Sequence, residues 1–396
     1  MQLRTVHPFP ARMAPELALN SLASLPANSV VLDPMAGSGT VLRQALSMGH
    51  QAVGFDMDPL AVLMSRVWTS VVDQASVHRE LEALLAESEY VDLRTERLPW
   101  HDEETQKFVR YWFGDEQRKA LTRLSIVMDR RRRSTRSAAR RSALDVLQVA
   151  MSRIIVTKEQ CASLARDTSH SRPHRVTLTS SYDVIDGFKR SVAQLTARLQ
   201  ANQTISNEQG TVSVSLGDAR AIALKDRSVD AIMTSPPYLN AIDYMRGHRL
   251  SLVWLGYSIS ELRAIRSNTI GAERSYDAEC STAENIAGAM CELERLAPNL
   301  RRMVVRYAGD LDRMMRQAAR VLRSNGTATY VLGNSCLKEV FIKNSEGVAS
   351  AGAHAGLSLI SVAERELPAA SRYLPVTETG SLSKRMRTET ILTFRR

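Results

Sequence analysis

The segment Ser29–Thr40 reads SVVLDPMAGSGT, and it decides the fold. Its apolar, β-branched start predicts a short strand over Ser29–Leu32, which runs into a turn containing two glycines. Helical spacing of apolar residues resumes over Val41–Met48. A second strand is expected over Gln51–Phe55 and a second helix over Leu60–Thr69. This alternation predicts an α/β fold built on a parallel sheet.

Five further strand signals extend the predicted sheet to about seven strands. They lie at 211–216, 229–233, 327–332, 357–363 and 388–394. Helical spacing is present over Pro15–Leu25 and along most of 243–321. Residues 76–205 differ, because they contain charged helical segments and few strand signals. We therefore expect residues 1–75 to begin the α/β domain, 76–205 to form a helical insertion, and 206–396 to complete the domain.

Composition excludes several classes of protein. The chain has 396 residues, 44% apolar and 24% charged, as in soluble globular proteins. No run of about 18 apolar residues is present to cross a bilayer, and Met1–Asn20 lacks the continuous apolar stretch of a secretory signal. We expect a cytoplasmic protein without a membrane partner. The four cysteines lack the close pairing of zinc ligands or disulfide scaffolds, so neither a metal nor a crosslink is expected.

A candidate nucleotide pocket follows the first strand. The spacing Gly37-x-Gly39 lets the backbone turn tightly and approach a ligand, and the helix behind it presents free amide groups. Asp56 lies 19 residues after Gly37, at the end of the next strand, where a carboxylate can accept both hydroxyls of a ribose. The third glycine of the dinucleotide fingerprint is missing, so pyrophosphate binding is not expected. The alternative is an ordinary turn between a strand and a helix.

A second candidate site is the run Ser235-Pro236-Pro237-Tyr238, which ends a predicted strand at the edge where open α/β sheets bind ligands. The exocyclic amine of a nucleobase is a poor nucleophile, because its lone pair is delocalised into the ring. Acceptors that hold its hydrogens draw the nitrogen toward tetrahedral geometry, and the Ser235 hydroxyl and Pro236 carbonyl suit this task. The Tyr238 ring offers a face on which an extruded base can stack. The alternative is a proline turn beside a core tyrosine.

Together these segments resemble the amino-group family of S-adenosylmethionine-dependent DNA methyltransferases. Asp33–Thr40 resembles the family's cofactor loop, 234–238 its catalytic motif, and His7–Arg12 the segment that closes over the methionine end of the cofactor. The match covers roughly the first 75 and the last 190 residues. It implies a Rossmann-like methyltransferase fold of about seven mostly parallel strands with a largely helical insertion.

The resemblance also implies roles for individual residues. Asp33 and the amides of Gly37 and Gly39 would hold the methionine part of S-adenosylmethionine. Asp56 would hold the ribose, and Asp218 the adenine amino group, although Gly-Asp after a strand is also an ordinary turn. The further cofactor contacts are Arg12, Pro34, Ala36 and Thr40. An arginine such as Arg12 in a surface loop is just as often solvated.

The target base would be held by Ser235, Pro236, Pro237 and Tyr238. In this family a serine at the head of the motif is typical of cytosine N4 methylation, whereas aspartate is commoner for adenine N6. Cytosine N4 is therefore favoured, with adenine N6 as the alternative. RNA guanine N2 and protein glutamine methyltransferases use similar pockets, and a DNA-binding protein with a degenerate methyltransferase fold is a third reading. The intact Asp33 and Asp56 count against that third reading.

The charge pattern suggests a nucleic-acid partner. The net charge is +10, and between residues 130 and 176 twelve Arg/Lys stand against three Asp/Glu. We expect double-stranded DNA as the partner and assign its recognition to the insertion by elimination. The expected contacts are Arg130, Arg131, Arg132, Arg133, Arg136, Arg166, His170, Arg172 and Arg175, with Asn240 and Arg246 after the catalytic motif. A solvated helix face is the alternative for the arginine run, and helix capping is the alternative for Asn240. A cognate restriction endonuclease and association with the nucleoid fit the same interpretation.

Overall fold

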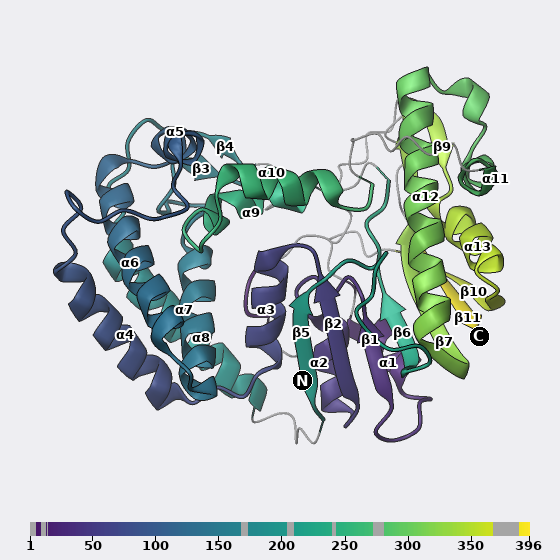
Figure 1. Ribbon diagram of the computed structural model, residues 1–396, viewed down its shortest axis with the longest axis horizontal. Coiled ribbons are helices and arrows are strands. Elements are labelled where there is room, and N and C mark those ends of the chain that lie inside the picture. Colours follow the sequence, from purple (N-terminus) through teal and green to yellow (C-terminus); the bar gives the residue numbers. More distant parts are fainter. Residues whose placement is uncertain are drawn as a thin grey trace.

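The computed structural model describes residues 5–8, 13, 15–167, 173–203, 210–239, 243–271, 281–366 and 388–396. At its centre is a seven-stranded sheet in the order β10-β11-β7-β6-β1-β2-β5 (Figure 1). The strands are β1 (Val30–Asp33), β2 (Gln51–Asp56), β5 (Val212–Leu216), β6 (Val229–Thr234), β7 (Leu322–Gly333), β10 (Ser358–Glu366) and β11 (Thr388–Arg395). Neighbours from β7 to β5 run parallel, and β11 is antiparallel to both β7 and β10. All the predicted strands are present, so the expected Rossmann-like α/β fold of about seven mostly parallel strands is confirmed.

Helices cover both faces of the sheet. The sequence of β1 shows why, because successive apolar residues point to opposite faces and both must be buried. Val31 packs into one core with α1 and α2, whereas its neighbour Leu32 points into the other core with α11, α12 and α13. Both residues are fully buried. The bounds are α1 (Pro15–Leu22), α2 (Thr40–Ser47), α11 (Ser281–Met290), a 3₁₀ turn (Leu293–Arg295), α12 (Pro298–Val321), α13 (Asn344–His354), and the small strands β8 (Ser335–Leu337) and β9 (Val340–Ile342).

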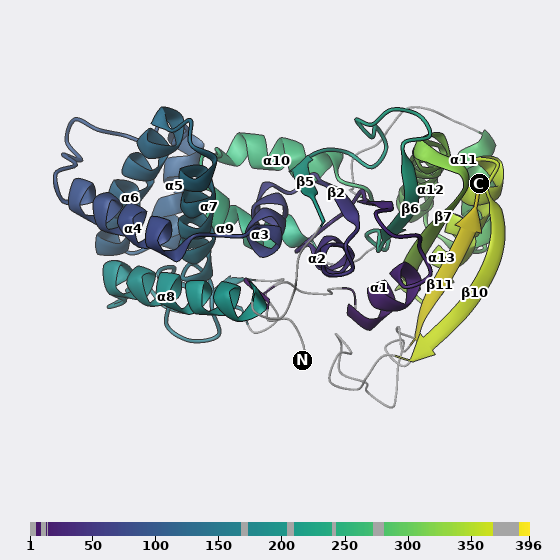
Figure 2. The ribbon, with the colours of Figure 1, turned by 90° about the horizontal axis from the view of Figure 1, so that it is seen from below.

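A helical region lies beside the β5 edge of the sheet (Figures 1 and 2). Its core includes Trp68 from α3, a helix that comes before the predicted insertion in sequence, and Trp254, which follows α9. The segment after the predicted catalytic motif therefore packs on this region. The elements are α3 (Pro59–Thr69), α4 (Gln74–Glu89), α5 (Glu103–Trp112), α6 (Asp115–Ser134), α7 (Ala138–Arg153), β3 (Ala165–Arg166), β4 (His174–Arg175), α8 (Val184–Gln203), α9 (Tyr244–Leu252) and α10 (Ile259–Asn268).

The helical stretch predicted over 243–321 is divided into several helices. One break, between α9 and α10, contains Gly256, whose φ of +107° is readily adopted only by glycine. Pro298 starts α12 at its first turn, where the missing amide donor costs nothing. Along the described parts of the chain, no helix combines the length and the apolar character needed to cross a membrane.

Buried charges join the helices of the helical region. The Glu80 side chain on α4, only 10% exposed, accepts hydrogen bonds from Arg131 on α6 at 2.7 Å and from Arg140 on α7 at 2.6 Å. Arg131 also pairs with Glu87, further along α4. Removal of Glu80 would take from Arg140 the acid that it pairs with, and would leave Arg131, only 11% exposed, with Glu87 alone.

Glu80→Gln should therefore lower the free energy of unfolding by about 3 kcal/mol. The matched control is Glu103→Gln, because Glu103 pairs with Lys107 on the surface with its side chain 81% exposed. That change should cost less than about 0.5 kcal/mol. Urea unfolding followed by circular dichroism measures both, and equal losses would contradict a structural role for the Glu80 network.

Candidate active site

The candidate site lies where β1, β2, β5 and β6 end, at the carboxyl edge of the sheet (Figure 1). Asp33 is the last residue of β1, and Thr234 is the last residue of its parallel neighbour β6. The Thr234 hydroxyl donates to the Asp33 carboxylate at 2.7 Å, and both side chains are buried. This bond places the glycine turn after Asp33 beside the Ser235–Tyr238 segment, so the two sequence motifs form one site.

The glycine turn is held against β2 and α3. The Ala36 amide donates to the Phe55 carbonyl at 2.8 Å, and the Ser65 hydroxyl donates to the Gly37 carbonyl at 2.9 Å. Gly39 has a φ of +92°, and a Cβ at this position would lie 2.8 Å from the Ser65 oxygen. Glycine is therefore required at Gly39 both by conformation and by space.

Asp56 links the end of β2 to this turn. Its carboxylate accepts from the amide of Gly37 at 2.8 Å and from the amide of Asp58 at 2.9 Å. Burial and the neighbouring Asp58 carboxylate raise the pKa of Asp56 to about 6, although the two amide donors and His248 oppose the rise. The carboxylate predicted to hold a ribose thus faces the glycine turn.

Asp33 is more strongly perturbed. Burial raises its pKa to about 7, against the lowering effect of the bonds from Thr234 and Met35. Two adjacent carboxyls with raised pKa values at the ligand-binding edge of a sheet are typical of a functional site.

Two hydroxyls in the turn could hold a polar ligand. Ser38 Oγ and Thr40 Oγ1 are buried and have no hydrogen-bond partner within the described part of the chain. A buried hydroxyl without a partner is costly, so a ligand that bonded to both would stabilise the turn. Thr40 was predicted as a contact, but Ser38 was missed, although its place between the two glycines is a usable signal.

Asp218, predicted from its place after β5, is engaged by its own neighbour. Arg220 grips the Asp218 carboxylate with its Nε and Nη2 at 2.9 and 2.7 Å. Arg220 also bonds to the buried Asp310 of α12 at 2.8 Å and to the backbone carbonyl of Asn268. Asp218 is therefore oriented by a two-pronged contact at the carboxyl edge, beside the end of β2.

The Ser235–Tyr238 segment forms a compact corner after β6. Pro236 is buried, and the hydroxyls of Ser235 and Tyr238 lie 3.4 Å apart. The Tyr307 hydroxyl from α12 donates to the Pro237 carbonyl at 2.9 Å. Burial raises the pKa of Tyr238 to about 12, so its hydroxyl is neutral at physiological pH. The Tyr238 ring is half-buried and borders the core formed with α12.

His248 is a buried residue whose contact the sequence did not reveal. Its Nδ1 bonds to Asp58, the residue that caps α3 beside Asp56. Burial lowers the pKa of His248, but Asp58 and the other nearby carboxylates outweigh burial and raise it. The helix that follows the corner is thus attached to the loop that follows β2.

The predicted DNA contacts that the structure describes differ in exposure and in partners. Arg131 and Arg132 form ion pairs within the helical region, with Glu80, Glu87 and Asp145 as partners. Arg130 and Arg133 also have acidic partners, but their side chains are 56% and 68% exposed. Arg136 and Arg246 are exposed too. Arg12, His170, Arg172 and Asn240 lie outside the described residues.

Arg166 and Arg175 have contacts within the β3–β4 hairpin and beside it. Arg166 donates to the Ala165 carbonyl at 2.7 Å, and Arg175 lies over the Tyr111 ring at 4.9 Å. Both side chains are half-buried. These contacts stabilise the hairpin, so binding to DNA is not required to explain either arginine.

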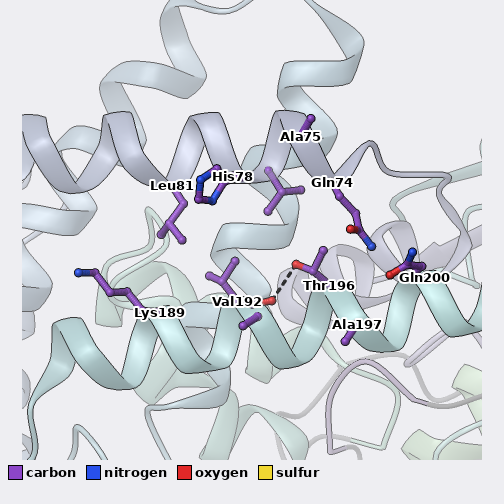
Figure 3. A pocket seen from close by; sticks show the side chains of 11 residues that line it. Gln74, Ala75, His78, Leu81, Lys189, Val192, Thr196, Ala197 and Gln200 are labelled. Atoms are coloured by element: carbon purple, nitrogen blue, oxygen red, sulfur yellow. Dashed lines mark hydrogen bonds between the residues drawn. The ribbon is translucent and has the colours of Figure 1, made fainter.

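A separate groove lies between α4 and α8, and its lining contains none of the predicted site residues (Figure 3). Leu81 and Val192 line it, with His78 and Lys189 beside them. The part of the chain that the structure describes contains no group of three or more His, Cys, Asp or Glu side chains placed to hold a metal ion.

The chain is similar to a methyltransferase. It is 20% identical over 377 residues to the Type II methyltransferase M.MvaI of Kocuria varians, and the match covers 85% of this chain and 78% of that protein. Among solved structures, a SAM-dependent methyltransferase from Methanosarcina mazei has a TM-score of 0.35 at 8% identity, over 97% of this chain and 98% of that one. A DNA modification methylase from Thermus thermophilus has a TM-score of 0.23 at 15% identity, over 46% of this chain and 50% of that one. No family model matches the sequence.

The raised pKa of Asp33 gives a testable dependence of stability on pH. Unfolded Asp33 ionises near pH 3.8 and the folded group near pH 7. The contribution of Asp33 to the stability of the wild type therefore falls as the pH rises through this window, because the unfolded state releases this proton first. Asp33→Asn keeps an oxygen that can accept from Thr234 but removes this titration.

The free energy of unfolding of Asp33→Asn relative to wild type should therefore increase from about pH 4.5 to about pH 8. Urea unfolding at several pH values measures this difference. A difference that stays constant across the window would contradict a buried Asp33 that ionises late.

Proposed function

We propose that this protein is an S-adenosylmethionine-dependent methyltransferase that modifies the exocyclic amino group of a base in double-stranded DNA, with cytosine N4 as the favoured target. The observation that carries the proposal is the bond between Thr234 and Asp33, which sets the acceptor-rich corner beside the glycine turn. The similarity to a Type II methyltransferase over 85% of the chain supports methyl transfer as the reaction.

The glycine turn suits this cofactor. S-adenosylmethionine, when bound, supplies an electrophilic methyl group on a positively charged sulfur. Ser38 and Thr40 offer buried hydroxyls without partners in the described chain. Gly37 and Gly39 both have positive φ values and form the tight turn that carries these hydroxyls. Asp56 would accept from the ribose hydroxyls, and Asp218 from the adenine amine. Arg12, Pro34 and Ala36 remain proposed contacts.

The corner suits an amine that must be made nucleophilic. Ser235 and the Pro236 carbonyl would accept the two amine hydrogens, and within the described chain no hydrogen bond reaches the Pro236 carbonyl. Tyr238 would stack on the flipped base. Pro237 has no amide hydrogen to compete for the acceptors. Serine at position 235 favours cytosine N4 over adenine N6, and a cognate restriction endonuclease fits this assignment.

The direct test is to incubate the protein with methyl-labelled S-adenosylmethionine and duplex DNA, and then to hydrolyse the DNA to nucleosides. Label in N4-methyl-2′-deoxycytidine is expected. Label only in N6-methyl-2′-deoxyadenosine would replace the base assignment. Structured RNA at matched salt tests guanine N2, and transfer to RNA alone would overturn DNA as the substrate.

Two substitutions should separate the two halves of the site. Tyr238→Ala should weaken binding of the target base by about tenfold or more, because stacking of a base on an aromatic ring is lost. Its affinity for S-adenosylmethionine should hardly change. Asp56→Ala should show the reverse pattern. Calorimetry with the cofactor and steady-state kinetics with DNA measure the two effects, and equal loss of cofactor affinity in both variants would refute the division of roles.

The exposed end of the arginine run gives a test of DNA binding. We consider the triple variant in which Arg130, Arg133 and Arg136 are all changed to glutamine. The slope of log affinity for DNA against log salt concentration should fall in magnitude by about 2–3, because each phosphate contact contributes about 0.9 to that slope. The control replaces Arg79, Arg94 and Arg190, which are 68%, 92% and 59% exposed and lie in the same helical region. Fluorescence anisotropy of labelled duplex DNA measures both triple variants, and the same slope in both would contradict a specific role for the run.

A further inference from the structure

Helix α12 contacts both halves of the site through two neighbouring residues. Tyr307 and Asp310 are three positions apart and so lie on the same helix face, and both are fully buried. Tyr307 contacts the corner, and Asp310 contacts the loop after β5. Neither residue belongs to a motif, and neither was predicted from the sequence.

Tyr307 controls one carbonyl of the corner. Its hydroxyl donates to the Pro237 carbonyl at 2.9 Å, which fixes the plane of the peptide between Pro237 and Tyr238. Prolines offer no amide hydrogens, so few other bonds can orient this turn. With the Pro237 carbonyl held by α12, the Pro236 carbonyl is left as the acceptor for a substrate amine.

Asp310 is linked through Arg220 to the carboxylate of Asp218, the proposed contact for the adenine of the cofactor. Its Oδ1 accepts from Arg220 at 2.8 Å and from Arg313 at 2.7 Å, and its Oδ2 accepts from the Gly271 amide at 3.2 Å. Arg220, whose side chain is 10% exposed, in turn grips Asp218 with two nitrogens. The planar guanidinium transmits the position of Asp310 to the orientation of the Asp218 carboxylate.

We propose that Tyr307 and Asp310 are positioning residues, the first for the amine acceptors of the corner and the second, through Arg220, for Asp218. The inference rests on the proposed methyl transfer. In this proposal each residue acts through one intermediate group, Tyr307 through the Pro237 carbonyl and Asp310 through Arg220. The two contacts therefore have separable effects, one on turnover and the other on cofactor affinity.

The test compares Tyr307→Phe with Tyr330→Phe. Tyr330 is also fully buried, but its hydroxyl has no hydrogen-bond partner in the described chain, so it controls for the loss of a buried hydroxyl. Tyr307→Phe should lower kcat on duplex DNA by about tenfold at saturating S-adenosylmethionine, equivalent to about 1.4 kcal/mol. The dissociation constant for S-adenosylmethionine, from calorimetry, should stay within about twofold. Tyr330→Phe should leave both quantities near wild type.

Arg220→Lys tests the second contact while keeping a positive charge beside Asp310. Lysine cannot contact the Asp218 carboxylate with two nitrogens at once, so Asp218 should be less well oriented for the cofactor. The dissociation constant for S-adenosylmethionine should therefore rise by about tenfold, while kcat at saturation stays within about twofold. Thermal unfolding of each variant shows whether it is folded.

An unchanged kcat in Tyr307→Phe, or the same loss in Tyr330→Phe, would overturn the role of Tyr307. An unchanged cofactor affinity in Arg220→Lys would overturn the role of Asp310. Wild-type protein that binds S-adenosylmethionine but methylates no DNA would instead refute the proposed function, and calorimetry on Arg220→Lys would still test the cofactor-side contact.

Discussion

The hydrogen bond from Thr234 to Asp33 is the contact on which the site depends. The two residues are 201 positions apart in sequence, and they meet because β1 and β6 are parallel neighbours that end at the same level. A carboxyl buried at this depth needs donors, since burial without them costs several kcal/mol. The bond meets that need and at the same time fixes the glycine turn relative to the proline corner.

The sheet could be predicted because its strands are short, β-branched and bounded by turn residues, a local pattern that survives in the folded chain. The motifs could be placed because each follows a strand, and parallel strands end at one edge. Tyr307, Asp310 and His248 could not be found in this way. They lie on helices, where a tyrosine, an aspartate or a histidine looks the same whether it supports a site or the core. Their roles follow from tertiary contacts with residues 70, 90 and 190 positions away.

The pattern of charges along the sequence predicted the contacts of individual residues less well than the spacing of the motifs did. A run of arginines shows a positive segment, but it does not show which acids face it after folding. Glu80 and Glu87 on α4 engage Arg131 across 51 and 44 positions, so part of the run stabilises helix packing. The exposed members, such as Arg133 and Arg136, remain available to an external polyanion. The sequence also did not show the partner of Asp218. Its carboxylate accepts a hydrogen bond from Arg220, two residues later.

The concentration of carboxyls at the candidate site supports the proposal that a ligand binds there. Asp33, Asp56 and Asp58 are close in space, and burial with mutual repulsion raises the pKa values of the first two to about 7 and about 6. A fold selected for stability alone would avoid this concentration of acids, because each ionised group raises the cost of the next. His248 offsets part of the charge through Asp58. A ligand that carries positive charge would offset more of this negative charge. It would bind best once Asp33 and Asp56 are both ionised. The positively charged sulfur and amine of the proposed cofactor have the sign that this arrangement favours, whereas an anionic phosphate has the opposite sign.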